Sequence, residues 1–530
     1  MEVQKLRNFL DVNDVMRGLI LQEYGARNIF IVLTHFYSWG EILYVVARRA
    51  SLRLIGVFAV VIFLVATNSL IVEGSTINVP GDYRSIQEAI DRASPGDVIF
   101  VGAGVYDGFK VTKSLTIIGE SNQSVLIQGS ITVLADNVRL SSVRVSVSEA
   151  SGSSVAIMIT GNNVVLVGVI VESYKYGLQV GDASKKVSGT IIERSKIISE
   201  DMSIYGSCSD LSVFYSEVVS RSKQAVNGCG VLDLEYSNIS GDTAVTTSFW
   251  YEGSVIKGNK ISGRSTGLYL DGNHHTVSNN KISGGTGVYL KGSGIIVENN
   301  EIINADTGIN IAGSHDNVVR GNRIASSGHA VDLSGNNNLI TNNTLMGGKG
   351  VHVSVGSGNI IAFNLINMTG IAGVYLSKYT SGNLVYGNTF WYCYNYEGAD
   401  ESGSNQWYIE NATHRLGNYW SYNKAPDKDG DGITDEPYHI ATTTGLEILD
   451  KYPLAKPLIS PYQQTTTTTP TTTPTTTPTL TTTPTPTPST TPTSTPQSSE
   501  TPDHQYTPII TAVIALILLA IAFILLRKRK

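Results

Sequence analysis

The sequence predicts an all-β chain, folded as a right-handed parallel β-helix, because two rows of residues repeat through its middle with one period. The first row is an asparagine that returns about every 21 residues, and it comprises Asn259, Asn280, Asn300, Asn322, Asn343, Asn364 and Asn388. The second row is a small residue followed by two apolar residues that flank a variable one, as in Gly267–Leu270 and Gly287–Leu290. Such short alternation of apolar residues is typical of strands and not of helices.

Stacked copies of one unit place equivalent residues roughly 4.8 Å apart on neighbouring coils. We therefore expect the asparagine row to form a buried ladder at an inner turn. Its amides would bond along the stack, and asparagine tolerates the left-handed backbone of such corners. Leucine-rich repeats have a similar length, but their leucine consensus is missing here. Dividing residues 110–390 by the period predicts about 13 coils and a rod roughly 60 Å long.

Residues 1–74 carry two apolar stretches that lie outside the repeats. Arginines precede the run Leu54–Val72, which predicts a signal sequence or signal anchor over residues 51–74. The other stretch, Ile29–Val46, is broken by His35 and Glu41. Two interpretations of residues 1–50 stay open: an extra interfacial or spanning helix, or a translation start downstream of Met1.

The two ends of a β-helix expose sheet edges that must be covered to prevent end-to-end pairing. Over residues 75–109 we expect an N-terminal cap. Ser85 and Glu88 form a capping box that opens a short helix ending at Ala93, and a strand follows at Val98–Val101. The repeats then occupy residues 110–395, and residues 396–462 form a C-terminal cap.

The C-terminal residues predict a protein held at the cell surface. Residues 463–508 are almost entirely Thr, Pro and Ser, which is typical of extended, O-glycosylated stalks. The apolar stretch Ile509–Leu526 is just long enough to span a membrane, and the basic residues 527–530 keep the tail in the cytoplasm. The body then lies outside the cell membrane. The net charge of −6, without a long basic run in the body, excludes nucleic acid as a partner.

The N-terminal motifs resemble those of a known family. Ile77–Ile90, Gly96-Asp97, Gly104–Tyr106 and Ser114–Gly119 are similar to the opening of pectin-lyase-like β-helix proteins. More narrowly, they resemble the NosD-like branch, the carbohydrate-binding and sugar-hydrolase repeat family of archaeal and bacterial surfaces. The resemblance covers residues 75–460 and implies the fold more than the function, since this fold serves lyases, hydrolases, adhesins and scaffolds. The NosD name implies copper handling, but the six methionines and nine histidines do not cluster in the sequence.

The C-terminal cap contains a predicted calcium loop. Gly417–Ser421 precedes Asp427–Asp435, and both motifs recur at this place in NosD-like proteins. Hard oxygen ligands at alternate positions suit Ca²⁺. The ligands at loop positions 1, 3, 5, 7 and 9 would be Asp427, Asp429, Asp431, the Ile433 carbonyl and Asp435, with Gly432 at the sharp turn. Position 12 is Tyr438 and not the bidentate Glu, so we expect Glu436 or Asp450 to complete the site of a structural Ca²⁺.

The variable residue of the second row should face solvent on every coil. This outward row comprises Tyr269, Tyr289, Asn310, Asp332, His352 and Tyr375. Its tyrosines and Asn310 are candidates for glycan binding, and Asp332 beside His352 is the weak candidate for catalysis because the pair could exchange a proton. The alternative is that the tyrosines only stabilise the sheet, since tyrosine is a good strand former.

Covalent modification is predicted at two kinds of residue. Cys208 and Cys229 are 21 residues apart, so they should stack on adjacent coils at a distance that a disulfide bridges; a reduced pair in a core ladder is the alternative. Candidate N-glycosylation sites are the sequons at Asn122, Asn238, Asn342, Asn367 and Asn411.

These observations favour a membrane-anchored rod that serves glycan binding, adhesion or envelope architecture. A polysaccharide lyase or glycoside hydrolase is the enzymatic alternative, and an accessory factor for metalloenzyme maturation is the second alternative. The expected partners are the membrane, glycans and other envelope proteins.

Overall fold

The computed structural model describes residues 74–182, 185–207, 209–228 and 230–458, together with the backbone of three N-terminal strands. These strands are β1 (Leu19–Tyr24), β2 (Asn28–Tyr37) and β3 (Gly40–Ala47), which pair antiparallel in the order β1-β2-β3. A helix over Ile29–Val46 was therefore the wrong expectation; its β-branched and aromatic residues favour strands. Residues 51–73, 463–508, 509–526 and 527–530, which carry the signal, stalk and anchor predictions, lie outside the described residues. Among the described residues, no helix has the length and apolarity needed to cross a membrane.

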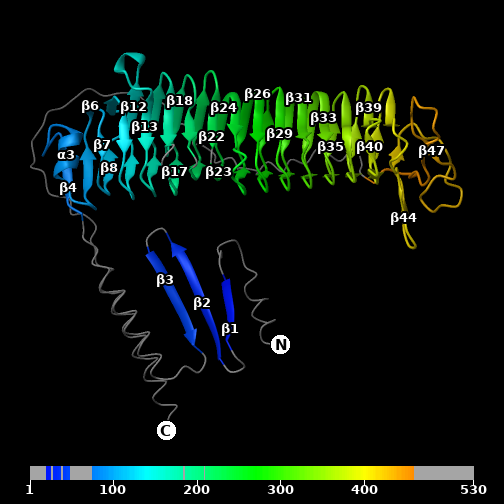
Figure 1. Ribbon diagram of the computed structural model, residues 1–530, viewed down its shortest axis with the longest axis horizontal. Coiled ribbons are helices and arrows are strands. Elements are labelled where there is room, and N and C mark those ends of the chain that lie inside the picture. Colours follow the sequence, from blue (N-terminus) through cyan, green and yellow to red (C-terminus); the bar gives the residue numbers. More distant parts are fainter. Residues whose placement is uncertain are drawn as a thin grey trace, which may run out of the picture. The chain divides into compact units, whose positions relative to one another are not determined.

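The main body is a right-handed parallel β-solenoid, as the repeat predicted. Coils follow one another along its axis from the blue to the orange end (Figure 1). Each coil contributes strands to three parallel sheets, which we call sheets 1, 2 and 3 in the order in which a coil passes through them. Sheet 1 has 15 strands and begins at β4, ahead of residue 110, so the expectation of about 13 coils was too low.

The strands of sheet 1 are β4 (Thr76–Val79), β5 (Val98–Val101), β8 (Thr116–Gly119), β11 (Arg139–Ser141), β14 (Val165–Val167), β17 (Thr190–Glu193), β20 (Leu211–Phe214), β23 (Leu232–Glu235), β25 (Val255–Lys257), β27 (Thr276–Ser278), β30 (Ile296–Glu298), β32 (Val318–Arg320), β34 (Leu339–Thr341), β37 (Ile360–Ala362) and β41 (Leu384–Tyr386).

The strands that belong to sheet 2 alone are β6 (Gly104–Asp107), β9 (Val125–Gln128), β12 (Arg144–Val147), β15 (Ile170–Ser173), β18 (Lys196–Ser199), β21 (Glu217–Ser220), β28 (Lys281–Ser283), β35 (Thr344–Met346), β38 (Leu365–Asn367), β42 (Thr389–Trp391) and β46 (Tyr419–Trp420). Those that belong to sheet 3 alone are β7 (Lys110–Val111), β10 (Ile131–Val133), β13 (Val155–Ile159), β16 (Tyr176–Val180), β19 (Ile204–Gly206), β22 (Gln224–Gly228), β29 (Thr286–Leu290), β36 (Lys349–Ser357), β39 (Ala372–Leu376), β40 (Thr380–Ser381, at the corner toward sheet 1) and β43 (Tyr396–Asp400).

Four long strands run from sheet 2 round the corner into sheet 3: β24 (Asn238–Thr246), β26 (Lys260–Leu270), β31 (Glu301–Ala312) and β33 (Arg323–Ser334). The remaining elements are a 3-10 turn at Glu149–Ser151 and two short antiparallel ribbons, β44–β45 (Ile409–Glu410 with Arg415–Leu416) and β47–β48 (Tyr438–His439 with Leu449–Asp450).

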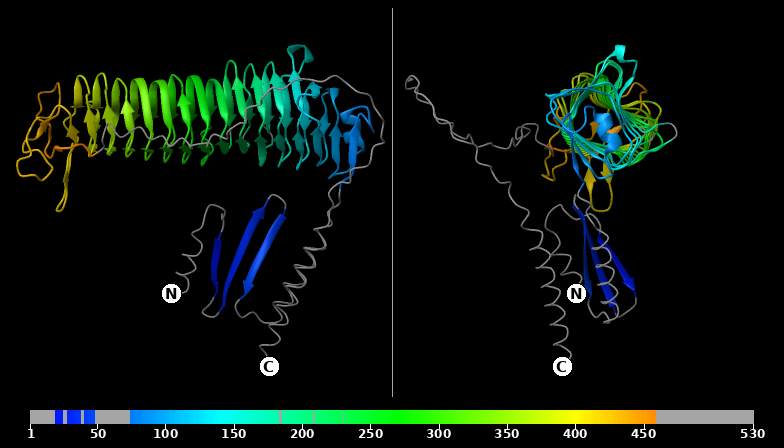
Figure 2. Two further views of the ribbon diagram at one scale, coloured as in Figure 1. Left: turned by 180° about the vertical axis from the view of Figure 1, so that it is seen from behind. Right: turned by 90° about the vertical axis from the view of Figure 1, so that its left-hand side faces the viewer.

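The helix α3 (Ile86–Arg92) lies over the first coil, as predicted (Figure 2). Ser85 caps it by accepting a hydrogen bond from the Glu88 N–H at 3.2 Å. Ile86, Ala89 and Ile90 are buried on one side of the helix, against the solenoid core. The predicted lid on the N-terminal edge is confirmed.

The predicted asparagine ladder runs along the corner between sheets 1 and 2. In each step, the Oδ1 of one asparagine accepts both the backbone N–H and the side-chain N–H of the asparagine one coil earlier. Asn322 donates in this way to Asn343 at 2.9 and 3.0 Å, and Asn322 Nδ2 also bonds the Val297 carbonyl at 2.8 Å. Ser195, Ser216 and Ser237 continue the column toward the N-terminus. The left-handed residue is the one before each ladder asparagine, for example Asn342, and not the ladder asparagine itself.

A second ladder, which the sequence analysis missed, lies at the corner between sheets 3 and 1. It runs in the same direction, with the same bonding pattern, through Asn317, Asn338, Asn359, Asn383 and Asn405. On an earlier coil, the same column is occupied by His275, whose Nδ1 accepts the Ser254 N–H at 3.1 Å. The two ladders hold two of the three corners of each coil in place.

Both ladders end on a buried carboxylate. The first ladder extends to Asn418, which donates its backbone N–H to Asp450 Oδ2 at 2.7 Å. The second ends at Asn405, which donates its side-chain N–H to Asp400 Oδ1 at 3.1 Å. Each acid also accepts an indole N–H, Asp450 from Trp420 at 2.9 Å and Asp400 from Trp407 at 3.3 Å. Asp450 accepts both N–H groups of Asn418, as the next asparagine of the ladder would, whereas Asp400 accepts only the side-chain N–H of Asn405.

Candidate functional site

The outward row on sheet 3 has the predicted register. Tyr269 pairs with Tyr289, Asp332 with His352, and His352 with Tyr375, on the strands β26 to β39. The side chains of the row point away from the core, but they are half-buried rather than fully exposed. They therefore form a shallow, partly desolvated line along the sheet.

A second outward row lies three residues earlier on the same strands. On these strands, two buried residues lie between each member of the second row and the member of the first row that follows it, and both of these members are half-buried. The members of the second row are Thr266, Thr286, Thr307, His329 and Lys349, and the register continues to Ala372, which is buried. His329 and Lys349 were not predicted as site residues, and this row brings them next to the Asp332–His352 pair.

Four polar side chains form a cluster in the middle of sheet 3. His352 Nδ1 lies 2.8 Å from Asp332 Oδ1, and the imidazole rings of His329 and His352 have centroids 4.9 Å apart. One ligating atom from each of His329, Asp332 and His352 lies within 4.8 Å of the other two. The Lys349 ammonium is 4.4 Å from the ring centroid of Tyr375. We call His329, Asp332, Lys349 and His352 the sheet 3 cluster.

Burial and neighbouring charges shift the pKa values of three groups in the sheet 3 cluster. Burial lowers the pKa of the His329 imidazole; Asp332 opposes this effect, and His352 and Lys349 add to it. Burial likewise lowers the pKa of Lys349. Burial acts to raise the pKa of Asp332, but the hydrogen bond with His352 and the charges of His352, His329 and Lys349 outweigh it and lower that pKa. The buried Nδ1 of His329 has no hydrogen-bond partner among the described residues.

Two imidazoles and a carboxylate at this spacing are a donor set for a first-row transition-metal ion. The expectation that the histidines do not cluster was therefore wrong for His329 and His352. They are 23 residues apart in the sequence and in different outward rows, so only the register of β33 on β36 brings them together. The Asp332 carboxylate could also orient the His352 imidazole, 2.8 Å away, as a proton donor or acceptor.

The tyrosines of the row have ring faces in contact with neighbouring side chains. Tyr269 and Tyr289 stack at 5.1 Å with an interplanar angle of 5°, so each covers one face of the other. Lys349 and His352 lie against Tyr375. Such contacts stabilise the sheet along its length.

The predicted calcium loop brings three carboxylates together. One oxygen from each of Asp427, Asp429 and Asp431 lies within 4.8 Å of the other two. Gly430 and Gly432 adopt left-handed φ values of 77° and 90°, which let the loop fold around these oxygens. Glu436 is exposed outside this group.

The remaining predicted loop ligands have other contacts. Asp435 accepts the Lys428 N–H at 3.2 Å. Asp450 is fully buried at the end of the first ladder, with its oxygens bonded to Asn418, Trp420 and Tyr452, so the structure assigns it to the core and not to the loop.

Tyr438, where an EF-hand would have Glu, belongs to the aromatic core of the cap. Its ring stacks on Trp420 at 4.2 Å and Trp420 stacks on Phe390 at 4.4 Å. Its hydroxyl lies 3.2 Å from Glu397 Oε2. The departure from the EF-hand pattern therefore has a structural reason: position 12 closes the hydrophobic end of the solenoid.

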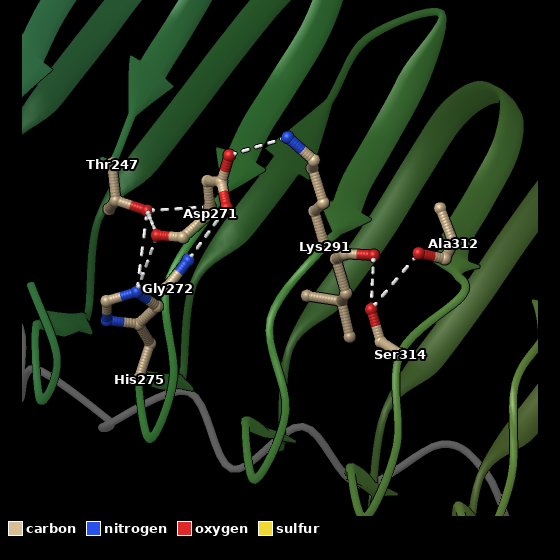
Figure 3. A network of polar contacts seen from close by, with 8 residues as sticks. Thr247, Asp271, Gly272, His275, Lys291, Ala312 and Ser314 are labelled. Carbon is tan, nitrogen blue, oxygen red and sulfur yellow. Dashed lines mark hydrogen bonds and ion pairs between the residues drawn. The ribbon is translucent and has the colours of Figure 1, made fainter. Parts of the chain in front are cut away.

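His275 shows why a histidine in this fold is often structural. Its Nε2 lies 3.0 Å from the Asp271 carbonyl and 3.5 Å from Thr247 Oγ1, beneath the ion pair of Asp271 with Lys291 at 2.9 Å (Figure 3). Burial lowers its pKa. All its contacts are internal, which excludes it from the candidate site.

The predicted modification sites differ in accessibility. Cys208 and Cys229 lie outside the described residues, and Cys393 is a buried free thiol whose pKa is raised by burial to about 12. Asn238, Asn342 and Asn411 are exposed, whereas Asn122 and Asn367 are half-buried.

The comparisons with known proteins agree with the predicted resemblance. Residues 239–425 match the family model described as periplasmic copper-binding protein (NosD), which confirms the NosD-like resemblance over that segment. No curated protein sequence matches the chain.

Several solved structures are similar to the chain. They include pectin methylesterase PemA from Erwinia chrysanthemi, with 15% identity, coverage of 39% of this chain and 78% of that one, and a TM-score of 0.26. DFA-IIIase from Arthrobacter chlorophenolicus A6 without its lid has 12% identity, coverage of 63% and 98%, and a TM-score of 0.41. Pectin methylesterase from carrot has 12% identity, coverage of 43% and 83%, and a TM-score of 0.30. Similarity at this level carries no information about a substrate.

Proposed function

We propose that this protein is a rigid surface rod that binds a first-row transition-metal ion, with copper(II) as the expected ion, at His329, Asp332 and His352. The observation that carries the proposal is the convergence of their ligating atoms to within 4.8 Å of one another. This makes the chain a metal-handling accessory protein of the kind that the NosD resemblance implies.

The donor chemistry supports a metal ion better than a purely structural cluster. Only a neutral imidazole can bind a metal ion, and burial favours the neutral form of His329 because it lowers the pKa of this ring. The unpartnered Nδ1 of His329 is a buried polar atom that costs free energy unless a ligand or proton donor satisfies it. Imidazole nitrogen suits copper, zinc and nickel, and copper(II) binds tightest in that series.

The family description bears on the same segment. The match to the family described as copper-binding spans residues 239–425, which contains all four residues of the sheet 3 cluster. Lys349 is the one unfavourable neighbour because its ammonium would repel a cation. Its ammonium lies 4.4 Å from the ring centroid of Tyr375, which gives the charge a partner outside the three proposed ligands.

A titration of the ectodomain, residues 75–460, with copper(II) tests this proposal. We expect one tightly bound equivalent by calorimetry, and a nitrogen-coordinated copper signal by electron paramagnetic resonance. His329→Ala and His352→Ala should each lower the affinity by at least about tenfold, because each removes one of three ligands. His315→Ala is the matched control, since His315 lies in a turn outside the cluster. Equal affinities in all three variants would refute the site.

A second function, glycan binding by a displayed rod, is favoured by the exposed aromatics near the C-terminal coils. Tyr379, Tyr394 and Tyr396 have 67%, 72% and 48% of their surface exposed, unlike the stacked Tyr269 and Tyr289. Exposed aromatic rings are suited to packing against the apolar faces of sugars. A glycan array on the ectodomain tests this function, with Tyr394→Ser and Tyr396→Ser expected to abolish any signal.

The enzymatic alternative receives less support. A retaining glycoside hydrolase needs two carboxylates about 5 Å apart, and an inverting one needs them somewhat farther apart. The sheet 3 cluster holds a single carboxylate, Asp332, together with two imidazoles and a lysine.

The surface location and the bound Ca²⁺ belong to the same proposal. The apolar stretch at 509–526 would anchor the rod with its body outside the cell and its tail in the cytoplasm. A Ca²⁺ ion at Asp427, Asp429 and Asp431 would relieve the repulsion among three neighbouring carboxylates and order the C-terminal cap.

A further inference from the structure

A surface groove lies at the corner between sheets 1 and 2, and some of the residues that line it are bulky side chains on a left-handed backbone. On every coil from 168 to 387 the residue before the inner corner residue adopts a left-handed φ near 50–70°; the inner residue is Val169 on the first of these coils and Ser or Asn on the others. Most coils place Gly or Asn there, which tolerate this conformation at low cost. Arg194, Tyr215, Tyr236 and Phe363 are bulky exceptions, with φ of 48°, 51°, 51° and 56°. The first three lie on consecutive coils and line one groove, whereas Phe363 stands alone between Asn342 and Gly387.

The two tyrosines are held in one place although they are exposed. Their rings stack at 5.4 Å with an interplanar angle of 10°, and 58% of Tyr215 and 48% of Tyr236 remain accessible to solvent. The Tyr236 ring also lies flat against Gly258, where a Cβ atom would approach it to 2.7 Å. A left-handed backbone at a bulky residue is kept where the side chain has a use. Since glycine serves the same corner on neighbouring coils, folding alone does not explain the tyrosines.

The tyrosines line a groove of about 390 Å³ together with amide and charged side chains. Its other lining residues include Asn122, Arg194 and Asn238. The volume lies in the range of small-ligand sites. Aromatic surface beside amides and a mixture of charges suits a sugar, which has apolar C–H faces and many hydroxyl groups, better than it suits an anion or an apolar ligand.

One wall of this groove is the acceptor asparagine of a predicted sequon. Asn238 is exposed at the start of β24, and its sequon continues through Ile239 to Ser240. Ser237 between Tyr236 and Asn238 points inward, where it is buried and bonded to the Glu235 carbonyl at 2.9 Å. Tyr236 and Asn238 therefore both lie on the outer surface, on either side of an inward residue.

The other sequons lack this combination. Asn122 donates its Nδ2 to the Gly168 carbonyl at 2.8 Å, so modification would break that bond. The Oδ1 of Asn367 is buried. Asn342 and Asn411 are exposed, but neither lines the groove.

We propose that Asn238 carries an N-linked glycan whose first sugar packs in the groove against Tyr215 and Tyr236. The groove then binds the chain's own glycan, and the first sugar of this glycan covers the rings of Tyr215 and Tyr236. This inference does not depend on the metal site, which lies on sheet 3.

The test uses the ectodomain purified from the envelope of its native host. Peptide mass spectrometry should find a glycan mass on Asn238. Asn238→Gln should lower the melting temperature by about 2 °C, because the sugar no longer covers the rings. In a Tyr215→Gly, Tyr236→Gly background, Asn238→Gln should have no effect. These glycine substitutions suit the left-handed corner and should leave the solenoid folded.

Three results would overturn the inference. Unmodified Asn238 in the native protein refutes the attached glycan. An equal effect of Asn238→Gln in both backgrounds shows a glycan that does not occupy the groove. A melting temperature that rises with added free saccharide, only when both tyrosines are present and Asn238 is unmodified, identifies the groove as a site for a separate sugar ligand.

Discussion

Asp450 lies 32 residues beyond Asn418 in the sequence, yet its Oδ2 accepts both the backbone and the side-chain N–H of that asparagine, at 2.7 and 3.3 Å. This pair ends the longer ladder, and it puts an ionisable group in the core of the cap. Burial raises the pKa of Asp450 to about 6, against an opposing effect of its hydrogen bonds.

The pH dependence of stability should report the ionisation of Asp450. Because its folded pKa of about 6 exceeds the ordinary 3.8, the folded state binds the proton more tightly, and the stability from this group falls as pH rises through 6. Between pH 5 and pH 8 we expect a loss of about 1 kcal/mol in the free energy of unfolding.

The comparison that isolates this effect is wild type against Asp450→Asn, by denaturant titration at each pH. His275 and His329, whose pKa values are lowered, act in the opposite direction and are present in both proteins. The difference in free energy between the two proteins should change by about 1 kcal/mol over this window. A difference that is constant with pH would show that Asp450 does not titrate there.

Substitution within either ladder should destabilise the solenoid. Asn322→Leu removes the Oδ1 that accepts two N–H groups of Asn300. The backbone N–H of Asn300 is then buried without an acceptor, whereas its side-chain amide keeps the carbonyls of Val277 and Glu298. We expect a loss of roughly 1–3 kcal/mol in the free energy of unfolding. Asn338→Leu should cost a similar amount in the second ladder. Asn342→Gly is the control, because this exposed left-handed corner suits glycine. Unchanged melting of both ladder variants would contradict the structural role.

Removal of Ca²⁺ should loosen the C-terminal cap. Three carboxylates within 4.8 Å repel one another without a cation, so chelation should lower the melting temperature and expose residues 417–455 to protease. Asp429→Ala should reproduce the effect of the chelator. Glu436→Ala is the control, since Glu436 lies outside the group. If calorimetry detects no heat of calcium binding, the loop is an acidic turn only.

The two cysteines outside the described residues give a simple chemical prediction. If Cys208 and Cys229 form the predicted disulfide, the unfolded, non-reduced ectodomain should label with one thiol per chain, at Cys393. Three labelled thiols would favour the reduced pair.

The repeat allowed much of the fold to be predicted, because a period places residues relative to one another without knowledge of any contact. The Asn322–Asn343 step and the Asp332–His352 pairing follow from spacing alone. The second ladder was missed although Asn317, Asn338 and Asn359 repeat with the same step, because their row is shorter.

The features that were not predicted have two causes. His329 belongs to the second outward row, whose position repeats but whose residue type changes from coil to coil, so no sequence motif marks it. Asp450 reaches Asn418 through the non-repetitive chain of the cap, where sequence distance says nothing about proximity. The first solenoid strand, β4, precedes the regular repeats and was assigned to the cap.

Because a carboxylate ends each ladder, the termination of the solenoid does not depend on how many coils precede it. Every step within a ladder repeats the same donors and acceptors, so the steps are interchangeable, and only the final acid differs. Residues 322–342 form one full turn, from one ladder asparagine to the residue before the next. If they were excised, Asn343 would take the place of Asn322 and accept the hydrogen bonds of Asn300. A chain shortened in this way keeps both its lid and its stops, which makes the number of coils adjustable in evolution or by engineering.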